Sequence, residues 1–323
     1  MAQYKREDTA VLSNVFTFLG APFVPVDSPE FKELKPKACL LGMTWDGSTV
    51  TRTGSAQGPA AVRGASASYL SYYDDYDVDV VEAYNLVDAG DCPIVPGNAA
   101  KTLEGSCQKI LTARRQGCLP VVMGGDHSIT IAPIWAMAKQ YKKLGFIHFD
   151  SHLDTADVVG GEKLSNWGTV RRAVDTGVFH PRNMASIGIR GALNPKFQRD
   201  YVKEKGITIF GIPEIEEHGI REVARRALEI ASNGTDGFYL TVDMDSLDAA
   251  CVPGTSCPTP GGITSRELFA ALDIIARGSL VGFDVVEVNP AYDHAGIVAF
   301  TAAQIILLVL AAHEQARKFG AKK

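Results

Sequence analysis

Cysteine is scarce in this sequence and follows no pattern. Among 323 residues there are six cysteines, and no two of them form a Cys-x-x-Cys pair. In a chain of this length we expect scattered cysteines to be reduced thiols in the interior, not a disulfide framework. The N-terminal residues are polar and lack the apolar core of a signal peptide. These absences predict a cytoplasmic location.

Long hydrophobic runs and a surplus of positive charge are missing as well. The most apolar stretch, Ile305–Ala312, has eight residues, whereas a membrane-spanning helix needs about 20, so we expect no membrane association. The net charge of −5 argues against nucleic acid as a partner and is compatible with a small cationic substrate. The residues that are present, 46% hydrophobic and 21% charged, exclude a disordered or fibrous chain.

Short apolar runs alternate with amphipathic stretches along the chain. The apolar runs are typical of strands buried on both faces of a parallel sheet, and the amphipathic stretches are typical of helices. The predicted strands are Lys37–Met43, Tyr84–Asp88, Leu119–Met123, Gly145–Phe149, Met184–Ile189, Ile207–Gly211, Phe238–Asp243 and Leu280–Val286. The predicted helices are Ala60–Tyr69, Ala99–Arg115, Ile129–Lys142, Asn194–Lys205, Pro213–Ser232, Ser265–Arg277 and Thr301–Phe319. This alternation predicts an α/β fold with three αβα layers and a mainly parallel sheet.

The predicted elements belong to a single domain, because no Pro- or Ser-rich linker and no internal repeat divides the chain. We expect this domain to span residues 36–323, after an N-terminal arm over 1–35 whose first dozen residues are loose. The helix predicted from Ser265 follows Thr264 and carries Glu267, the spacing of a capping box. The last predicted helix is apolar on most sides in its first half, so we expect it to be buried in the interior or at a subunit contact.

Acidic and histidine residues gather at the ends of three predicted strands. These clusters are Gly-Gly-Asp126-His127, Asp150-x-His152-x-Asp154 and Asp243-x-Asp245. Alternate residues of an extended chain share one face, so the second cluster alone presents three potential ligands to one side. Taken singly, the first and third patterns are common in turns and loops. The second places charged groups at the end of a buried strand, which is costly unless they are paired or bind a metal.

Together the clusters offer more ligands than one small cation needs. Four carboxylates and two imidazoles fit two cations that share bridging carboxylates. Oxygen-rich ligation with some imidazole suits Mn²⁺ best, with Ni²⁺, Fe²⁺ and Zn²⁺ as alternatives. The sequence therefore predicts two divalent metal ions, with manganese favoured and nickel as the main alternative.

Longer motifs around these clusters resemble those of a known family. Gly124–His127, Asp150–Asp154, Asp243–Asp248, Val286–Pro290 and Tyr292–His294 are similar, in this order, to motifs of the ureohydrolase family of arginases and agmatinases. Ile187–Gly191 and Asp88–Asn98 are more similar to the agmatinase branch. The resemblance implies the arginase-like fold, a catalytic domain over 36–323 and a homo-oligomer, either a trimer or a hexamer.

The resemblance also implies a ligand set and a reaction. One metal ion would be held by His127, Asp150, Asp154 and Asp243, and the other by Asp150, His152, Asp243 and Asp245, with Asp150 and Asp243 as bridges. Glu287 would bind the guanidinium group of the substrate, and Asp154 and Glu287 are the catalytic candidates. The implied activity is hydrolysis of a guanidino compound to urea plus an amine or ammonia. His148 and His294 fall in matching contexts, each either as a hydrogen-bonding group behind the ligands or as an ordinary interior histidine.

Three positions depart from the family pattern. The segment usually written Ser-His-Gly-Thr is Leu164–Thr169 here, so Asn166 or Trp167 replaces a histidine. Thr259 stands where a glutamate is usual, and Ser151 where an alanine is usual. We expect Asn166 and Trp167 to contact a substrate that is smaller or less charged at its tail than agmatine: guanidine, a short alkylguanidine or a guanidino acid. Trp167 would narrow the pocket or stack on a cation, or else pack the loop.

The missing histidine motivates a second hypothesis, a catalytically silent subunit with an assembly or regulatory role. The complete ligand set weighs against this hypothesis. A content of two bound ions would support the enzyme, and a content of none would support the silent subunit.

Overall fold

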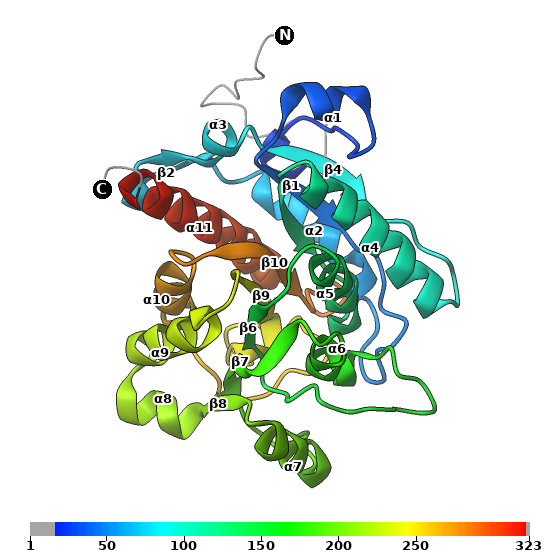
Figure 1. Ribbon diagram of the computed structural model, residues 1–323, viewed down its shortest axis with the longest axis vertical. Helices are drawn as coiled ribbons and strands as arrows, with labels where there is room; N and C mark the ends of the chain where they lie inside the picture. Colours follow the sequence, from blue (N-terminus) through cyan, green and yellow to red (C-terminus); the bar gives the residue numbers. More distant parts are fainter. Residues whose placement is uncertain (1–16, 321–323) are drawn as a thin grey trace.

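An eight-stranded sheet lies at the centre of the computed structural model, which describes residues 17–320 (Figure 1). Its strands are β1 (Ala38–Gly42), β4 (Val87–Asp91), β5 (Leu119–Met123), β6 (Leu144–Phe149), β7 (Phe179–Ile189), β8 (Thr208–Gly211), β9 (Phe238–Asp243) and β10 (Leu280–Val286). The strand order is β4-β1-β5-β10-β9-β6-β7-β8, and all neighbouring pairs are parallel. A separate antiparallel pair is formed by β2 (Tyr72–Tyr73) and β3 (Val78–Asp79).

Helices cover both faces of the sheet (Figure 1). They are α1 (Pro29–Leu34), α2 (Gly58–Ser66), α3 (Val80–Tyr84), α4 (Ala99–Arg115), α5 (Ile131–Ala138), α6 (Thr169–Asp175), α7 (Lys196–Lys205), α8 (Ile212–His218), α9 (Ile220–Ser232), α10 (Ser265–Ile275) and α11 (Ile297–Gly320). One hydrophobic core joins the sheet to α2, α9, α10 and α11, and a second joins its other face to α4, α5, α6 and α7. The predicted α/β fold with three αβα layers in a single domain is confirmed.

The central strands match their predicted bounds because they are buried on both faces. Every residue of β5, β9 and β10 is buried, which is the condition that produces a continuous apolar run. The capping box at the start of α10 is also present. The amide of Glu267 donates to Thr264 Oγ1 at 3.2 Å, and the amide of Thr264 donates to Glu267 Oε2 at 2.7 Å.

Several predicted elements differ from the observed ones, three of them for clear local reasons, while β7 begins five residues earlier than predicted and α11 four residues earlier. The helix predicted over Pro213–Ser232 is two helices, because Gly219 lies between α8 and α9 with φ of +77°. The helix predicted over Ile129–Lys142 is shorter, because a 3-10 turn over His127–Thr130 precedes α5. The strand predicted over Tyr84–Asp88 lies later, as β4, because the residues before it form α3.

Helix α11 corrects the expectation that no segment is long and apolar enough to span a membrane. The stretch Ile297–Lys318 meets that test by length and composition, because small and apolar residues continue on both sides of Ile305–Ala312. In the structure, 72% of its most apolar window is buried within the protein, where α11 packs against α2, α10 and β10. It is an interior helix, as its apolar surface predicts.

The described residues 17–35 pack against the domain. The Val24 amide donates to the Asp88 carbonyl and the Asp88 amide donates to the Pro22 carbonyl, both at 2.9 Å. The side chains of Phe18 and Phe31 are buried. The loose segment predicted for the first dozen residues lies outside the described part of the chain.

Candidate metal centre

The candidate ligands lie at the carboxyl ends of four neighbouring strands. The residues in question are His127 after β5, Asp150, His152 and Asp154 after β6, Asp243 and Asp245 at the end of β9, and Glu287 after β10. The strands β5, β10, β9 and β6 are adjacent in the sheet, and ligands of open α/β sheets bind at this edge. The topology brings His127 into contact with Glu287, 160 positions away in the sequence.

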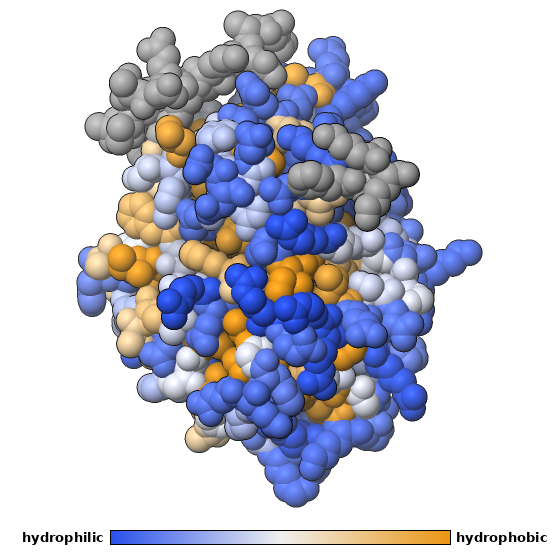
Figure 2. Space-filling model, turned by 90° about the vertical axis from the view of Figure 1, so that its left-hand side faces the viewer, coloured by the Kyte–Doolittle hydropathy of each residue, from blue (hydrophilic) through white to orange (hydrophobic). Residues whose placement is uncertain are grey.

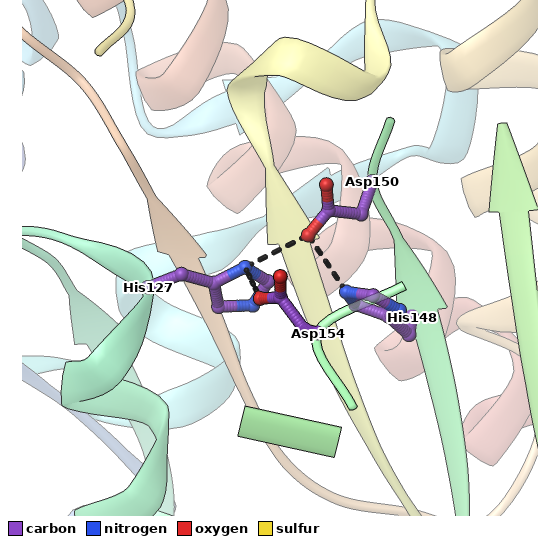
Figure 3. A group of neighbouring side chains, drawn as sticks. All are labelled: His127, His148, Asp150 and Asp154. Carbon is purple, nitrogen blue, oxygen red and sulfur yellow. Dashed lines mark hydrogen bonds and ion pairs between the residues drawn. The ribbon is translucent and has the colours of Figure 1, made fainter. Parts of the chain in front are cut away.

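His127 is the centre of the first cluster (Figure 3). Its Nδ1 lies 2.9 Å from Asp150 Oδ2 and 3.2 Å from Asp154 Oδ2. Asp243 brings a further carboxylate oxygen to 3.1 Å. Nδ1 faces these oxygens but makes no hydrogen bond of good geometry to any described residue, and all four side chains are buried. A ring nitrogen and three carboxylate oxygens facing a common point fit a divalent cation.

The second cluster consists of His152, Asp245 and the other oxygen of Asp150. His152 Nδ1 lies 3.1 Å from Asp150 Oδ1 and 3.2 Å from Asp245 Oδ2. Asp150 therefore takes part in both clusters, one oxygen in each, which is the arrangement expected of a bridging ligand. Asp243 Oδ2 faces His127, whereas its Oδ1 accepts a hydrogen bond from the Asp245 amide at 2.8 Å. The bridging role of Asp243 stays a prediction.

Burial and mutual repulsion make these carboxylates costly without a cation. Burial, together with the neighbouring charges of Asp245 and Asp150, raises the pKa of Asp243 well above its usual range. Burial and Asp150 also raise the pKa of Asp154. For His127, burial alone would lower the pKa, but the close carboxylates of Asp150, Asp154 and Asp243 raise it well above its usual value. A bound divalent cation would favour the charged form of these carboxylates.

His148 supports the ligands from behind, and His294 does not. His148 is fully buried, with Nε2 2.8 Å from Asp150 Oδ2 and Nδ1 3.0 Å from Ser186 Oγ. Of the two roles that the sequence left open for His148, the structure therefore supports a hydrogen-bonding group behind the ligands over an ordinary interior histidine. His294 is exposed, so both possibilities considered for it were wrong. The segment that contains it lies at the surface, between β10 and α11.

Glu287 presents an unpaired carboxylate oxygen to the same site. Its φ is +64°, and that of Asp154 is +48°; such strain in residues other than glycine is concentrated at functional sites. Glu287 Oε1 accepts a hydrogen bond from the His127 amide at 2.9 Å, whereas Oε2 is buried and has no hydrogen-bond partner among residues 17–320. Burial, reinforced by the Asp126 carboxylate, raises the pKa of Glu287 to about 8. A cation with N–H donors would satisfy Oε2 and favour the charged carboxylate.

A pocket opens onto both clusters and Glu287. The rest of its wall consists of neutral side chains: Thr51, Asn166, Trp167, Leu193, Gln198 and Cys257. The side-chain oxygen of Asn166 is buried and has no hydrogen-bond partner in the described part of the chain. Trp167 is partly exposed, and its carbonyl accepts a hydrogen bond from the Ala156 amide at 2.8 Å. That Asn166 and Trp167 bind substrate stays a prediction.

Asp126 holds part of this wall in place, a role that the sequence did not reveal. Its Oδ2 accepts hydrogen bonds from the Ser48 amide at 2.9 Å and from Ser48 Oγ at 2.8 Å. Ser48 Oγ in turn accepts the amide of Asn166 at 3.1 Å. The only available signal was the position of Asp126 next to His127, which an ordinary helix cap also explains.

Arg190 is a second residue that sequence reasoning did not single out. Its guanidinium donates hydrogen bonds to the carbonyls of Asp245 at 2.9 Å, Ser246 at 3.1 Å and Leu247 at 3.0 Å. It also donates to the carbonyls of Thr259 and Pro260. One side chain thus holds the turn that carries Asp245 against the loop over 250–262.

Sequence comparison identifies relatives over most of the chain. The model of the Arginase family matches residues 36–311. The chain is 36% identical to an agmatinase from Bacillus subtilis over 90% of this chain and 95% of that protein. It is 34% identical to a proclavaminate amidinohydrolase from Streptomyces clavuligerus over 82% of this chain and 84% of the relative. It is also 34% identical to a guanidinopropionase from Pseudomonas aeruginosa over 86% and 87% of the two chains.

Solved structures of similar proteins share the α/β fold of this chain. The proclavaminate amidinohydrolase of Streptomyces clavuligerus superimposes with a TM-score of 0.87 at 30% identity, covering 95% of this chain and 99% of that one. A formimidoylglutamase from Bacillus subtilis gives a TM-score of 0.84 at 25% identity, with 96% of both chains covered. This chain therefore belongs to the arginase family, and it is an amidinohydrolase that acts on C–N bonds of linear amidines at a metal centre.

Proposed function

We propose that this amidinohydrolase uses two divalent metal ions to convert a small guanidino compound to urea and an amine or ammonia. One observation carries the proposal: two His/Asp clusters share Asp150 and open onto the pocket in which Glu287 Oε2 has no hydrogen-bond partner among the described residues. The alternative of a catalytically silent subunit is not favoured, because the predicted ligands gather in one place together with Glu287.

The donor atoms fit the ions that the sequence predicts. Carboxylate oxygens outnumber imidazole nitrogens in both clusters, which supports Mn²⁺, with Ni²⁺ as the alternative. When two such ions are bound, they lower the pKa of a water molecule and supply hydroxide near neutral pH.

The residues of the chain orient the substrate. A guanidinium ion is planar and stays protonated, so it needs an anion in a fixed orientation. The His127 amide fixes Glu287 through Oε1, and Oε2 accepts an N–H of the substrate. The unpaired oxygen of Asn166 accepts a second N–H. Asp154, which lines the pocket beside His127, carries a proton to the nitrogen that leaves as the C–N bond breaks.

The neutral pocket wall favours a substrate with a short tail that carries no charge. Outside the candidate ligands and Glu287, no charged residue of the described chain lines the pocket. An ammonium tail like that of agmatine would meet Trp167, Leu193 and Cys257 without an ion-pair partner, which disfavours its transfer from water. A guanidino acid would likewise find no cation for its carboxylate. Guanidine and short alkylguanidines are therefore the proposed substrates.

Urea release from a panel of guanidino compounds tests this proposal. The protein is loaded with Mn²⁺ or Ni²⁺ and assayed with guanidine, methylguanidine, 4-guanidinobutyrate and agmatine. We expect kcat/KM to be highest for guanidine or methylguanidine and activity to disappear on chelation. A clear preference for agmatine would refute the short-tail substrate, and no urea from any compound by protein that holds two ions would refute the reaction.

We further propose a cytoplasmic homo-oligomer, a trimer or a hexamer, on the basis of the family resemblance. The mass in solution, measured by light scattering, tests the oligomeric state. A monomer at assay concentrations would contradict it.

A further inference from the structure

Ser151 lies between the second metal cluster and the loop over 250–262. Ser151 Oγ donates a hydrogen bond to Asp245 Oδ1 at 2.8 Å, and the Ser151 amide donates to the same oxygen at 3.1 Å. Oδ1 is thus occupied by two donors of one residue, while Oδ2 faces His152 at 3.2 Å. Both Ser151 and Asp245 are buried, so water does not replace a lost donor easily.

Thr259 reaches the same hydroxyl from the side of the loop. Ser151 Oγ and Thr259 Oγ1 are 3.3 Å apart, within hydrogen-bond distance. The methyl group of Thr259 lies against Gly191, where an added Cβ would come within 2.9 Å of it, and the carbonyl of Thr259 accepts a hydrogen bond from Arg190. Thr259 does not line the pocket. Its hydroxyl also donates a hydrogen bond to the Cys257 carbonyl at 3.1 Å, and its link to the second cluster is the contact with Ser151 Oγ.

We propose that Ser151 is a positioning residue for the second metal ion, with Thr259 as its support. The hydroxyl keeps Asp245 turned so that a single oxygen, Oδ2, is available to the cation. The two positions at which this chain has a hydroxyl residue in place of the usual family residue are thus in contact with each other. This inference rests on the two-metal site of the proposed function.

The hydrogen bonds that remain at Asp245 determine the expected effect of removing the Ser151 hydroxyl. In a Ser151→Ala variant, Asp245 Oδ1 keeps the amide of residue 151 but loses its shorter hydrogen bond, so the carboxylate can rotate. Loss of a group that orients a metal ligand costs about 10- to 100-fold in metal affinity. Because one donor remains, we expect a loss of about 10-fold at the second site and no change at the first.

The experiment titrates the metal-free full-length chain with Mn²⁺ and resolves the two binding steps by calorimetry. Ser151→Ala is compared with Thr259→Val, Thr259→Ser and the double variant of Ser151→Ala with Thr259→Val. Ser106→Ala, at a buried serine of α4, is the matched control. Thermal unfolding of each metal-free variant checks that the fold is intact.

The expected pattern is specific to the proposed unit. Ser151→Ala weakens only the second metal-binding step, and Thr259→Val weakens the same step by less. Thr259→Ser keeps the hydroxyl and binds as the unmodified chain does. The double variant resembles Ser151→Ala alone, because Thr259 acts on the second metal site through Ser151. Unchanged affinity at both sites in Ser151→Ala, or additive losses in the double variant, would overturn the inference while leaving the reaction intact. Failure of the unmodified chain to bind two ions would overturn the proposed function as well.

Discussion

Asp150 is the residue shared by both clusters, because Oδ2 faces His127 and Oδ1 faces His152. Asp150→Asn removes the shared charge and replaces one of these oxygens by an amide, so we expect both metal ions and urea release to be lost. Asp154→Asn is the matched control, since Asp154 contacts only the first cluster, and we expect it to keep one ion. Metal content of the purified variants by mass spectrometry decides between these outcomes. Retention of two ions by Asp150→Asn would contradict the shared role.

The same measurement tests Asp243, whose contacts point to the first cluster. If Asp243 bridges as predicted, Asp243→Asn loses both ions, as Asp150→Asn does. Retention of one ion in Asp243→Asn would show that Asp150 bridges alone. We expect loss of both, because the carboxylates of Asp243 and Asp245 are close enough to interact electrostatically, so the charge of Asp243 also acts at the second cluster.

Glu287→Gln separates substrate binding from metal binding. Glutamine has the same shape but no charge, and either orientation of its amide loses the interaction of a carboxylate oxygen with the guanidinium group. A hydrogen bond to a charged group contributes about 1.5–3 kcal/mol, so we expect kcat/KM to fall by roughly 10- to 150-fold. The content of two metal ions should not change, because the contact of Glu287 with His127 is through the backbone amide. A metal-depleted variant would mean that Glu287 is misassigned.

At the scale of single residues, the sequence predicted the position of those candidate ligands that depend only on where a strand ends. Asp150, His152 and Asp154 follow a buried strand, so their place at its carboxyl end was predictable. The period of two assumed an extended chain, whereas β6 ends at Phe149 and Asp154 has φ of +48°. The hydrogen bonds of Ser48 to Asp126 and of Arg190 to distant carbonyls join loops far apart in the sequence. No local pattern encodes such contacts, and they were therefore not predicted.

At the scale of elements, burial explains both the successes and the failures. The helix α4 and the strands β5, β9 and β10 were predicted with their observed bounds, because their patterns arise from large buried surfaces. The break between α8 and α9 was not predicted, because the helical pattern continues across it. The break depends on one backbone conformation, that of Gly219 with φ of +77° and ψ of 145°.

Gly219→Ala measures the cost of that conformation. An added Cβ meets no atom within 4 Å, so the expected destabilisation comes only from the backbone and is about 1–2 kcal/mol. Gly64 in α2 is the matched control, because it is equally open but has no positive φ. We expect Gly64→Ala to stabilise the protein by about 0.5–1 kcal/mol. Urea unfolding of both variants shows whether each substitution lowers or raises the free energy of unfolding. Equal changes in Gly219→Ala and Gly64→Ala would contradict the conformational explanation.

At the scale of the whole molecule, two hydrophobic cores fix the sheet edge on which the site is built. Figure 2 shows that one side of the molecule mixes hydrophobic and hydrophilic residues in small groups, whereas the most continuous apolar segment, α11, is inside. Composition alone does not distinguish such a helix from a membrane span, because both are long and apolar. Its place in the fold depends on packing partners from α2 and α10, which are distant in sequence.

Metal binding should raise the stability of the whole molecule, since the folded state alone brings the clusters together. The buried carboxylates repel one another in the metal-free protein, and a cation that binds only the folded state stabilises it by about 2.7 kcal/mol at 100 times its Kd. For a chain of 323 residues, this corresponds to a rise in the unfolding temperature of about 4 °C per ion. Scanning calorimetry at increasing Mn²⁺ concentration measures the rise, with Asp150→Asn as the control that should not respond. An unfolding temperature independent of Mn²⁺ and of Ni²⁺ in the unmodified chain would mean that the clusters do not hold ions in the folded state.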